Sequence, residues 1–437
     1  MARTLIRDIF QNANEKEQYL VKGWVYRKTD LGKKSFLMVR DRSGSIQTVL
    51  GNKENANSLY DSINVGDVIA LKGNVKEDNR APNGKEINIE HLEIVNPCQQ
   101  PAPFPLDHME ERETLPDLNI RLDYRYLDLR NKNVSDIFRV KSKTASSLRE
   151  HLEENDFIEI QTPKIVASAT EGGTNLFPIE YFEKDAFLAQ SPQFYKQMMM
   201  ASGLERVFEI APCFRAERHG TTSHLNEFTS VDFEMAFIKN EEDVMKMAEK
   251  VLSSTMNDLK EYGKKINLEK QITVPQSPFP RIKMEEAYSI LENNGISVEI
   301  GEDVGPNGEK ILGDHVKKSN NSEIFFLTEY PKESRPLYTM PHEEKPEYTR
   351  SFDIIFKGTE IISGGQRIHE HKMLEDAFEK KGIDTKDYGF YVDTFKYGMP
   401  PHGGLGLGLD RFVYKMLDLE NIREAVLFPR DKNRITP

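Results

Sequence analysis

Residues 400–419, PPHGGLGLGLDRFVYKMLDL, constrain the fold more than any other stretch, because alternating glycines run directly into a helical pattern. A dinucleotide fingerprint needs an early βα unit and a P-loop needs Gly-Lys-Ser/Thr, and neither is present. We therefore predict a glycine-rich strand leading into a helix packed on the core. Arg411 lies off the apolar stripe of that helix and is free to meet a nucleotide ring or a phosphate. The stripe comprises Leu409, Phe412, Val413, Met416 and Leu417.

A proline-rich segment at residues 96–107, NPCQQPAPFPLD, indicates an extended connection between two domains, since proline fixes φ and removes a backbone donor. Before it, apolar and β-branched runs separated by turn sequences predict about five strands and an OB-type barrel, although another small β-barrel fits the same pattern. We predict an OB-fold domain at residues 1–102, a linker at 103–135 and a larger domain at 136–437.

The predicted barrel carries rings and cations that suit a single-stranded nucleic acid. Tyr26 and Phe36 offer surfaces on which bases can stack. The whole chain has a net charge of −12, which argues against indiscriminate coating of nucleic acid but permits local basic patches. The candidate phosphate partners are Arg27, Lys28, Lys33, Lys34 and Arg40.

The larger domain reads as α+β with an antiparallel sheet. An amphipathic helix with Ala145, Leu148 and Leu152 on one stripe stops near Asn155, and a strand with Ile158 and Ile160 follows. We treat an inserted segment at about 270–345 as scaffold rather than chemistry, with a proline-led helix at residues 280–295 and a buried strand at 323–331.

The stretch FRAERHGTTSHLNEF, residues 214–228, packs charged side chains into one loop between two expected strands. Strand alternation puts Arg215 and Glu217 on one sheet face, and likewise Ser230, Asp232 and Glu234. Val231, Phe233 and Met235 then face the core. Such a polar face suits a nucleotide with phosphates, and a solvated strand pair with surface ion pairs is the alternative.

The stretch GTEIISGGQRIHEH, residues 358–371, places Glu360, Ser363 and Arg367 close together with two glycines between the last two. Carboxylate and hydroxyl oxygens beside a phosphate site are ligands that Mg²⁺ prefers, and arginine is a forked partner for a carboxylate. A glycine-turn hairpin with incidental polar residues remains the alternative.

Nothing in the sequence predicts export, a membrane span or structural zinc. The apolar runs are too short to cross a bilayer, and the N-terminal stretch MARTLIRDIFQNANEKEQ lacks a secretion signal. Cys98 and Cys213 have neither metal-ligand nor disulfide-framework spacing, so we expect ordinary buried thiols. A cytoplasmic protein without membrane contact is the expectation.

The stretches FIEIQTPKI, FRAE…HLNEF and GGLGLGLDR, in this order behind an OB-type domain, resemble the three motifs of class II aminoacyl-tRNA synthetases of the aspartyl and asparaginyl branch. The likeness covers essentially the whole chain. It implies an α+β fold, an antiparallel catalytic sheet flanked by helices, and a homodimer formed through the helix and strand that end at Pro163. It also implies ATP bound in a bent shape with Mg²⁺, two or three ions in all.

The resemblance implies roles for individual residues. Arg215 and Arg411 would be catalytic, acting on phosphates and transferred charge, and Glu360 and Ser363 would hold Mg²⁺. The ATP site would comprise Arg215, Ala216, Glu217, Ser223, His224, Leu225, Glu360, Gly408, Leu409, Asp410 and Arg411. The aspartate site would comprise Glu171, Gln193, Lys196, Arg215, Asp232, Ser363 and Arg367.

Lys196 and Arg367 mark the aspartyl members of the branch, because a carboxylate substrate calls for fixed cations that an amide would leave unpaired. The expected partners are ATP, L-aspartate and tRNA(Asp), with tRNA(Asn) as a second tRNA left open. In the barrel, the anticodon would meet Tyr26, Phe36, Gln47 and Lys85. Lys85 fits members that charge tRNA(Asp) alone, whereas Tyr26 departs from the tryptophan expected of them.

Two departures from the motifs stand out. Asp410 replaces a usual glutamate, with little expected loss, and Ser223 replaces an arginine, so Arg218 or His219 would have to compensate. The alternatives are an asparaginyl enzyme, a paralogue that makes aspartyl-adenylate for asparagine synthesis, and a catalytically silent RNA-binding protein. The barrel disfavours the paralogue, which does not need one. The intact motif residues disfavour the silent RNA-binding protein.

Overall fold

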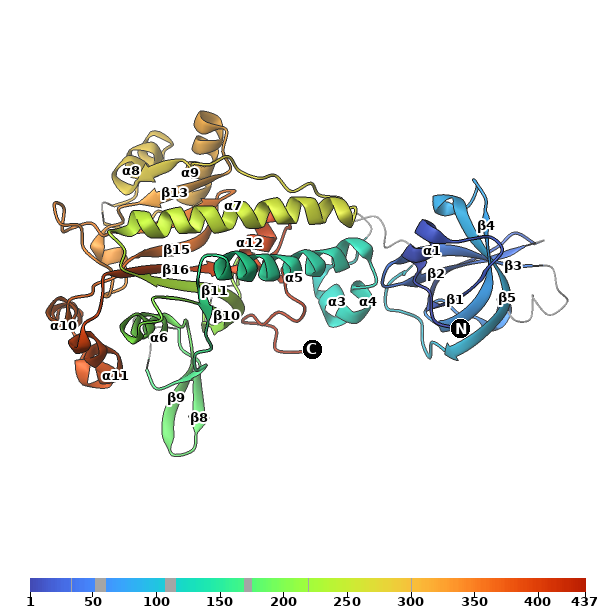
Figure 1. The fold of residues 1–437 in the computed structure, drawn as a ribbon, viewed down its shortest axis with the longest axis horizontal. Coiled ribbons are helices and arrows are strands. Elements are labelled where there is room, and N and C mark those ends of the chain that lie inside the picture. Colours follow the sequence, from blue (N-terminus) through green and yellow to red (C-terminus); the bar gives the residue numbers. More distant parts are fainter. Residues whose placement is uncertain (33, 52–59, 107–114, 169–174, 219, 300) are drawn as a thin grey trace. The chain divides into compact units, whose positions relative to one another are not determined.

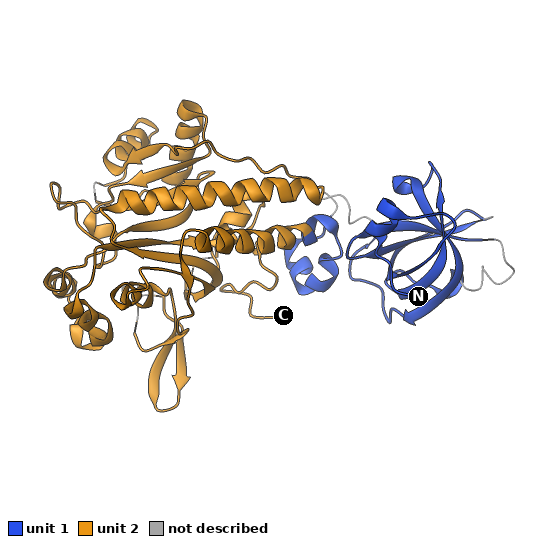
Figure 2. Cartoon of the chain, viewed as in Figure 1, with its two compact units in different colours: residues 1–135 blue, residues 136–437 orange. Residues whose placement is uncertain are grey.

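The computed structural model describes residues 1–437 except 33, 52–59, 107–114, 169–174, 219 and 300. The chain divides into two compact units, Met1–Ser135 and Asp136–Pro437 (Figure 2). The smaller unit contains the segment 103–106 and 115–135 together with the barrel that precedes it.

In the smaller unit, strands close into a barrel in the order β1-β2-β3-β5-β4. Each strand alternates between the interior and the surface, so Leu37 and Val39 of β2 are fully buried whereas Phe36 and Met38 are only half-buried. This confirms the predicted OB-type barrel. The elements are α1 (Ile6–Asn12), β1 (Gln18–Asp30), β2 (Ser35–Asp41), β3 (Gly44–Leu50), β4 (Val68–Glu77) and β5 (Lys85–Asn96), with α3 (Leu118–Asp123) and α4 (Arg125–Asp128) after the barrel.

The larger unit is built on a mixed, mostly antiparallel sheet in the order β12-β13-β14-β15-β16-β11-β10-β6 (Figure 1). Only the outer pairs β12–β13 and β10–β6 run parallel. The predicted antiparallel sheet is confirmed. Its strands are β6 (Ile158–Glu159), β10 (Arg206–Phe214), β11 (Glu227–Ala236), β12 (Arg281–Lys283), β13 (Ile324–Thr328), β14 (Ser351–Phe356), β15 (Glu360–Gln366) and β16 (His402–Gly408).

One face of this sheet is covered by two long helices, α5 (Lys132–Glu153) and α7 (Glu241–Lys265) (Figure 1). The expected inward residues Val231, Phe233 and Met235 join Leu148 and Leu152 of α5 in a single apolar core. The predicted stripe of α12 (Leu409–Met416) packs into the same core. Because the apolar side chains of β11 fill this face, its alternate residues turn to the opposite face, where the polar site lies.

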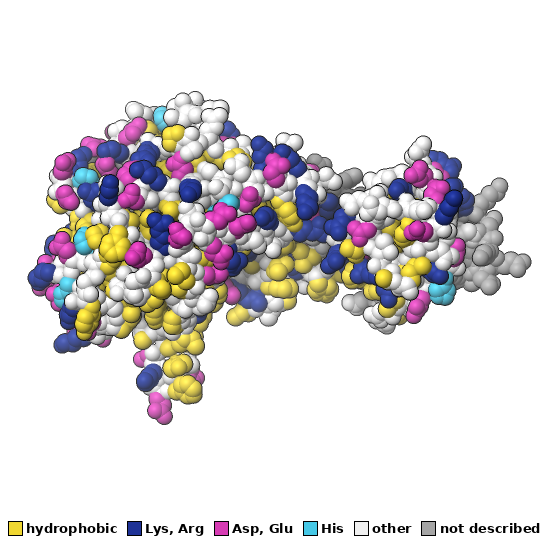
Figure 3. All heavy atoms as spheres, in the orientation of Figure 1, with side chains coloured by type: hydrophobic (Ala, Val, Ile, Leu, Met, Phe, Trp, Pro, Cys, Tyr) yellow, Lys and Arg dark blue, Asp and Glu magenta, His cyan; other side chains and the backbone are white. Residues whose placement is uncertain are grey.

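The remaining elements border the polar face. A small sheet in the order β7-β9-β8 includes a projecting hairpin of β8 and β9, and apolar side chains gather around it on the face drawn in Figure 3. Elsewhere on that face acidic and basic side chains are interspersed. These elements are β7 (Ile165–Val166), β8 (Pro178–Tyr181), β9 (Lys184–Leu188), α6 (Gln193–Met198), α10 (His371–Lys380) and α11 (Gly389–Val392).

The segment at 270–345 differs from its sequence-based description. The helix expected from Pro280 begins only at Met284, because residues 281–283 pair with β13 as strand β12. The helix α8 (Met284–Asn293) is followed by α9 (Gly305–Asn320), which the glycine-rich start GPNG concealed. The expected buried strand is β13.

The two cysteines differ in burial. Cys213 is buried as predicted, but Cys98 is only half-buried. Among the described residues, no helix is both long and apolar enough to cross a bilayer.

Candidate active site and nucleic-acid interface

A cavity of about 320 Å³ lies over the polar face of the larger sheet. It is lined by residues from the stretches 214–228, 358–371 and 400–419, together with residues from the segments that precede α6 and β14. The predicted residues that line it are Gln193, Arg215, Glu217, Ser223, His224, Leu225, Asp232, Glu360, Ser363, Arg367, Gly408, Asp410 and Arg411. Ala216, Lys196 and Leu409 lie outside its lining, and Glu171 lies outside the described residues.

Arg215 and Glu217 follow the end of β10, where the loop toward β11 begins. The backbone N–H of Arg215 donates to the oxygen of Asn226 at 2.9 Å, which extends the strand pairing by one residue. The Asn226 amide donates to the carbonyls of Arg215 at 2.7 Å and Glu217 at 3.0 Å. The loop entry is therefore fixed by Asn226, and both predicted side chains line the cavity.

The far end of the same loop brings His224 to the cavity. Its Nδ1 lies 2.6 Å from Oγ1 of Thr221 and 3.2 Å from the Ser223 hydroxyl. Arg218 does not line this cavity but a separate one beside the C-terminal segment, and His219 lies outside the described residues. The expectation that Arg218 compensates for Ser223 therefore has no support in the cavity lining.

Arg335 is a cavity residue that sequence reasoning missed. Its Nη1 donates to the Ser363 hydroxyl at 3.0 Å and its Nη2 to Asp353 at 2.7 Å, while its guanidinium lies 3.5 Å from the ring centre of Tyr330. The carboxylate of Asp353 raises the pKa of Arg335, so the guanidinium stays charged although it is buried. The description of 270–345 as scaffold alone is wrong at these cavity residues: Arg335, Pro336, Tyr338 and Thr339.

Glu360 sits at the start of β15 in an acidic surrounding. Partial loss of hydration raises its pKa to about 8 although the side chain is still 34% exposed, and the neighbouring carboxylates of Asp353 and Glu309 act in the same direction. Arg411 and Arg335 oppose this shift. Glu309 also accepts a hydrogen bond from the Glu360 backbone N–H at 2.7 Å. A carboxyl group that holds a proton near neutral pH is suited to exchange it for a metal ion.

The donor set at this point fits Mg²⁺. Glu360 and Ser363 offer oxygens to the cavity, and the buried Oδ1 of Asp353 has no hydrogen-bond partner among the described residues. No group of three or more His, Cys, Asp or Glu side chains in the described parts of the chain is arranged to hold a metal unaided. Mg²⁺ suits such a site because it takes one or two carboxylates and completes its shell with substrate phosphates and waters.

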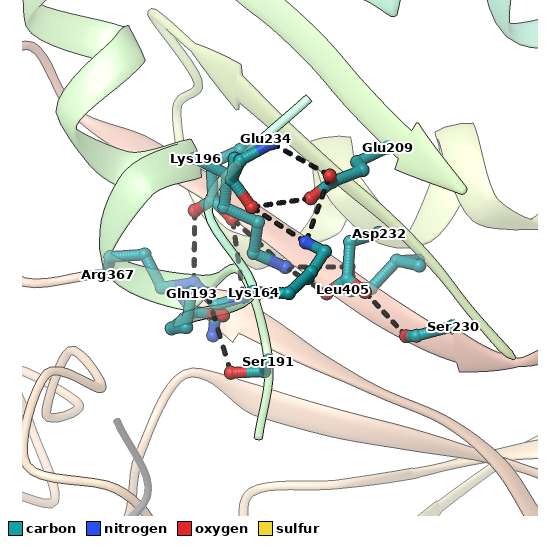
Figure 4. A network of polar contacts seen from close by, with 11 residues as sticks. Lys164, Ser191, Gln193, Lys196, Glu209, Ser230, Asp232, Glu234, Arg367 and Leu405 are labelled. Carbon is teal, nitrogen blue, oxygen red and sulfur yellow. Dashed lines mark hydrogen bonds and ion pairs between the residues drawn. The ribbon is translucent and has the colours of Figure 1, made fainter. Parts of the chain in front are cut away.

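Two buried ion pairs form the floor on the other side of the cavity (Figure 4). Lys196 of α6 donates to Asp232 at 2.9 Å and to the carbonyl of Leu405 at 2.8 Å. Arg367 donates through Nε to Glu234 at 3.0 Å. Asp232 also accepts from Ser230 at 2.5 Å. The predicted cations are thus present, and each is already balanced by a carboxylate on β11.

Gln193 supplies a polar group beside these pairs. Its side-chain nitrogen is buried and has no hydrogen-bond partner among the described residues. Because an unsatisfied buried donor is costly, this nitrogen is suited to a ligand acceptor.

The glycines of β16 leave room for the carboxylates of β11. A Cβ on Gly404 would lie 2.2 Å from the Glu234 carboxylate and 2.1 Å from the carbonyl oxygen of Phe233. A Cβ on Gly406 would lie 3.0 Å from Asp232. Gly404 is therefore required by its packing against β11, and Gly406 leaves the Asp232 carboxylate little spare room.

Arg411 leaves the first turn of α12 toward the cavity, as its position off the apolar stripe predicts. Its Nη1 donates to the backbone oxygen of Glu360 at 2.9 Å. This contact brings the glycine-rich strand and helix together with the carboxylate of β15 at one wall of the site.

The barrel has a second cavity, of about 740 Å³, on its outer face. Tyr26, Phe36 and Gln47 line it, and Tyr26 stands at an irregularity in the β1–β2 pairing, which re-aims the side chain. The Gln47 amide donates to Glu86 at 3.0 Å. Lys85 does not line this cavity and donates instead to the carbonyl of Phe10 at 3.2 Å.

Among the expected phosphate partners, only two of the described ones, Arg27 and Lys34, border the barrel cavity. Lys28 points to the carbonyl of Tyr60 at 2.8 Å, and Lys33 lies outside the described residues. Arg40 is not part of the lining.

Comparison with known families matches both units. Residues 117–432 match the model of class II tRNA synthetases (D, K and N), and residues 19–95 match the OB-fold nucleic acid binding domain.

Individual relatives cover nearly the whole chain. It is 46% identical to the aspartate–tRNA(Asp) ligase of Pyrococcus horikoshii over 95% of both chains. It is 44% identical to the aspartate–tRNA(Asp/Asn) ligase of Archaeoglobus fulgidus over 97% of both. Among solved structures, asparaginyl-tRNA synthetase from Pyrococcus horikoshii, complexed with asparaginyl-adenylate, matches with a TM-score of 0.92 and 33% identity over the full length of both chains.

Proposed function

The chain belongs to the class II tRNA synthetases, and from this we infer that it is an aspartate–tRNA ligase, which activates L-aspartate with ATP and transfers it to the 3′ end of tRNA(Asp). The observation that carries the inference is the convergence of Arg215, Glu360, Arg367 and Arg411 on one cavity. These residues come from separate stretches of sequence and supply phosphate, metal and carboxylate partners together.

The choice of aspartate rests on Lys196 and Arg367. Each cation is held by a carboxylate of β11, so the floor of the pocket is close to neutral before the substrate enters. Fixed cations at this position favour an acidic side chain, and the neutral amide of asparagine would gain less from them. The unsatisfied nitrogen of Gln193 and the acidic Asp232 are suited to the carboxylate and amino groups of an amino acid.

Adenylate formation needs positioned charge and no protein nucleophile. The carboxylate of aspartate attacks the α-phosphorus of ATP, the bond to the bridging oxygen breaks, and pyrophosphate leaves with its electron pair. Arg215 would bind the α-phosphate and the attacking carboxylate together, which orients the two reactants and stabilises charge as it is transferred. Arg411 would stack on adenine and reach the outer phosphates.

Transfer completes the reaction. The terminal ribose hydroxyl of the tRNA attacks the activated carbonyl, AMP leaves, and the proton of the hydroxyl leaves with it. Arg215, Glu217 and residues 223–225 border the cavity along which the acceptor end would enter. His224 is held by Thr221 and Ser223 and would contact the outer phosphates.

Glu360 and Ser363 are the residues that would hold Mg²⁺, with Asp353 beside them. The ion, when bound with ATP, supplies charge neutralisation at the phosphates. Arg335 holds the Ser363 hydroxyl on the same wall and so orients this ligand.

The barrel would bind the anticodon. Phe36 and Tyr26 supply stacking surfaces, and the Gln47–Glu86 pair supplies an edge with both donor and acceptor groups. Whether tRNA(Asn) is also charged is proposed to depend on this cavity. Lys85 would have to leave the carbonyl of Phe10 to reach a base, so Tyr26 carries more of the proposed discrimination.

A homodimer is proposed through the edge strand β6 and helix α5. The edge of the sheet at β6 is short, and Ile158 on it is 48% exposed. A second copy of the chain would cover both the edge and this side chain.

Aspartate-dependent ATP–pyrophosphate exchange tests the proposal. We expect exchange with aspartate and little with asparagine, and the absence of exchange with both would refute the enzyme assignment. Asparagine is the second candidate substrate because the asparaginyl enzyme has nearly the same fold. Charging purified tRNA(Asp) and tRNA(Asn) in parallel separates the two tRNA specificities.

A further inference from the structure

Lys141, in α5, holds two separate parts of the larger unit through one ammonium group. It donates to the carboxylate of Asp410, in the first turn of α12, and to the backbone oxygen of Ala425 at 3.1 Å. Its side chain is 20% exposed and does not line the active-site cavity. Any effect of Lys141 on ATP must therefore pass through other residues.

Asp410 is the first of these two contacts. It is 2% exposed, and its second carboxylate oxygen accepts the backbone N–H of Thr229 on β11 at 2.8 Å. The carboxylate thus joins α5, β11 and the start of α12. The next residue is Arg411, whose guanidinium donates to the backbone of Glu360. The pair formed by Lys141 and Asp410 lies one residue away from the proposed adenine and phosphate partner.

Ala425 is the second contact, and it leads to the loop over the phosphates. It ends a short turn, Ile422–Ala425, whose first residue lines the cavity. The backbone N–H of Ile422 donates to the oxygen of Thr222 at 2.9 Å. Thr222 directly precedes Ser223 and His224, so the ammonium group also fixes the turn on which this part of the loop rests.

We propose that Lys141 is a positioning residue for the ATP site, acting through Asp410 on Arg411 and through Ala425 on the loop at 222–224. The proposal rests on the function inferred above. Removing the ammonium group leaves a buried carboxylate without its cation, and the start of α12 must then rearrange. This rearrangement displaces Arg411, which directly follows Asp410 in the chain.

The aspartate pocket is held independently. Lys196 bonds to Asp232 and to the carbonyl of Leu405, and Arg367 bonds to Glu234, whereas the partners of Lys141 are Asp410 and Ala425. Loss of the Lys141 side chain should therefore raise the KM for ATP and leave the KM for aspartate nearly unchanged. A residue that merely stabilised the fold would not produce this separation.

Steady-state ATP–pyrophosphate exchange with the full chain tests the proposal, with each substrate varied in turn. For Lys141→Met we expect the KM for ATP to rise about tenfold while the KM for aspartate changes by less than about twofold. Lys141→Arg should restore most of the ATP affinity because it keeps the charge. The double variant Lys141→Met with Asp410→Asn should bind ATP better than Lys141→Met, because the unpaired buried charge is gone.

Arg350→Met is the matched control. The side chain of Arg350 is also partly buried, at 16% exposure. It forms an ion pair with Glu241, with 3.1 Å between Nη1 and Oε2, and neither residue lines the cavity. Its loss should leave both KM values unchanged. If Lys141→Met fails to fold, Lys141→Gln gives the same test, because it removes the charge but keeps a side chain that can donate a hydrogen bond.

Two results would overturn the proposal. One is an equal rise in both KM values, and the other is a loss of thermal stability with both KM values unchanged. No exchange by the wild-type chain would instead refute the inferred function, so the two failures are distinguishable.

Discussion

Lys196 and Asp232 form a nearly fully buried ion pair, with 2.9 Å between Nζ and Oδ1, directly beneath the candidate aspartate pocket. Glu234 lies 3.6 Å from the same ammonium group. Lys196 and Arg367, which bonds to Glu234, therefore together balance two buried carboxylates that would otherwise repel one another. The charge of the pocket floor depends on both side chains.

Replacement of Lys196 by glutamine should lower kcat/KM for aspartate by about 100-fold or more, since a buried charge pair is broken and a fixed cation is lost. The KM for ATP should change little. Lys164→Gln is the control: Lys164 pairs with Glu209 at 3.0 Å in the neighbouring network but does not line the cavity (Figure 4). Equal losses in the two variants would argue against a specific role for Lys196.

Arg215 should be essential for the chemical step. Arg215→Lys keeps a positive charge but loses the fork that would bind two oxygens at once, so we expect kcat of the exchange reaction to fall by about 100-fold. Arg218→Lys, in the same loop but lining a different cavity, should leave kcat within about twofold. A wild-type kcat in Arg215→Lys would contradict the proposed role.

The raised pKa of Glu360 predicts a pH dependence. The free carboxyl group has a pKa of 4.5 and the folded one about 8, so the folded state holds a proton that the unfolded chain releases between these values. The contribution of Glu360 to stability therefore decreases as pH rises through this window.

Metal binding should show the opposite trend. Mg²⁺ must displace the proton, so the KM for ATP at fixed free Mg²⁺ should fall as pH rises from about 6 to about 8. Glu360→Gln should bind Mg·ATP weakly and without this trend. A KM for ATP in the wild type that stays constant over this range would contradict the assignment.

Ser223 is the place where a cation can be added. Ser223→Arg would put a guanidinium at the cavity wall beside His224, and we expect the KM for ATP to fall about threefold through contact with the outer phosphates. Measurement of exchange at varied ATP checks this. An unchanged KM would show that Arg335 and Arg411 already supply enough positive charge.

Phe36 should matter for tRNA and not for adenylate formation. Phe36→Ala removes a stacking surface from the barrel cavity, so the KM for tRNA(Asp) in aminoacylation should rise about tenfold while exchange is unchanged. Val95→Ala, at a side chain 52% exposed and outside that cavity, should affect neither reaction. A matching defect in exchange would mean that Phe36 serves folding instead.

Strand alternation and helical periodicity predicted the barrel, the antiparallel sheet and the core-facing side chains. Val231, Phe233 and Met235 are buried because their period of two fits a sheet covered by helices on one face. The same logic placed Asp232 and Arg411 at the cavity. These patterns are informative because buried side chains recur every second residue in a strand and every three to four residues in a helix.

The residues that the sequence did not predict lie in segments where burial shows no regular repeat. Arg335 and Tyr338 stand in an irregular segment between β13 and β14, and only tertiary packing brings them to Ser363 and the cavity. Strand β12 was missed because three residues are too few to show alternation, and its pairing with β13 is a long-range contact. Glu309 was missed because its helix begins with glycine, proline and asparagine, which favour turns.

The glycines of β16 also limit how this pocket can be redesigned. A single methyl group at Gly404 would collide with the carboxylate that holds Arg367. Gly404 therefore cannot be replaced without disturbing the Glu234–Arg367 pair on which the proposed choice of substrate depends. Attempts to redirect the enzyme to another amino acid have to alter the surrounding charged residues together, because a Cβ at Gly404 would displace the Glu234 carboxylate that pairs with Arg367.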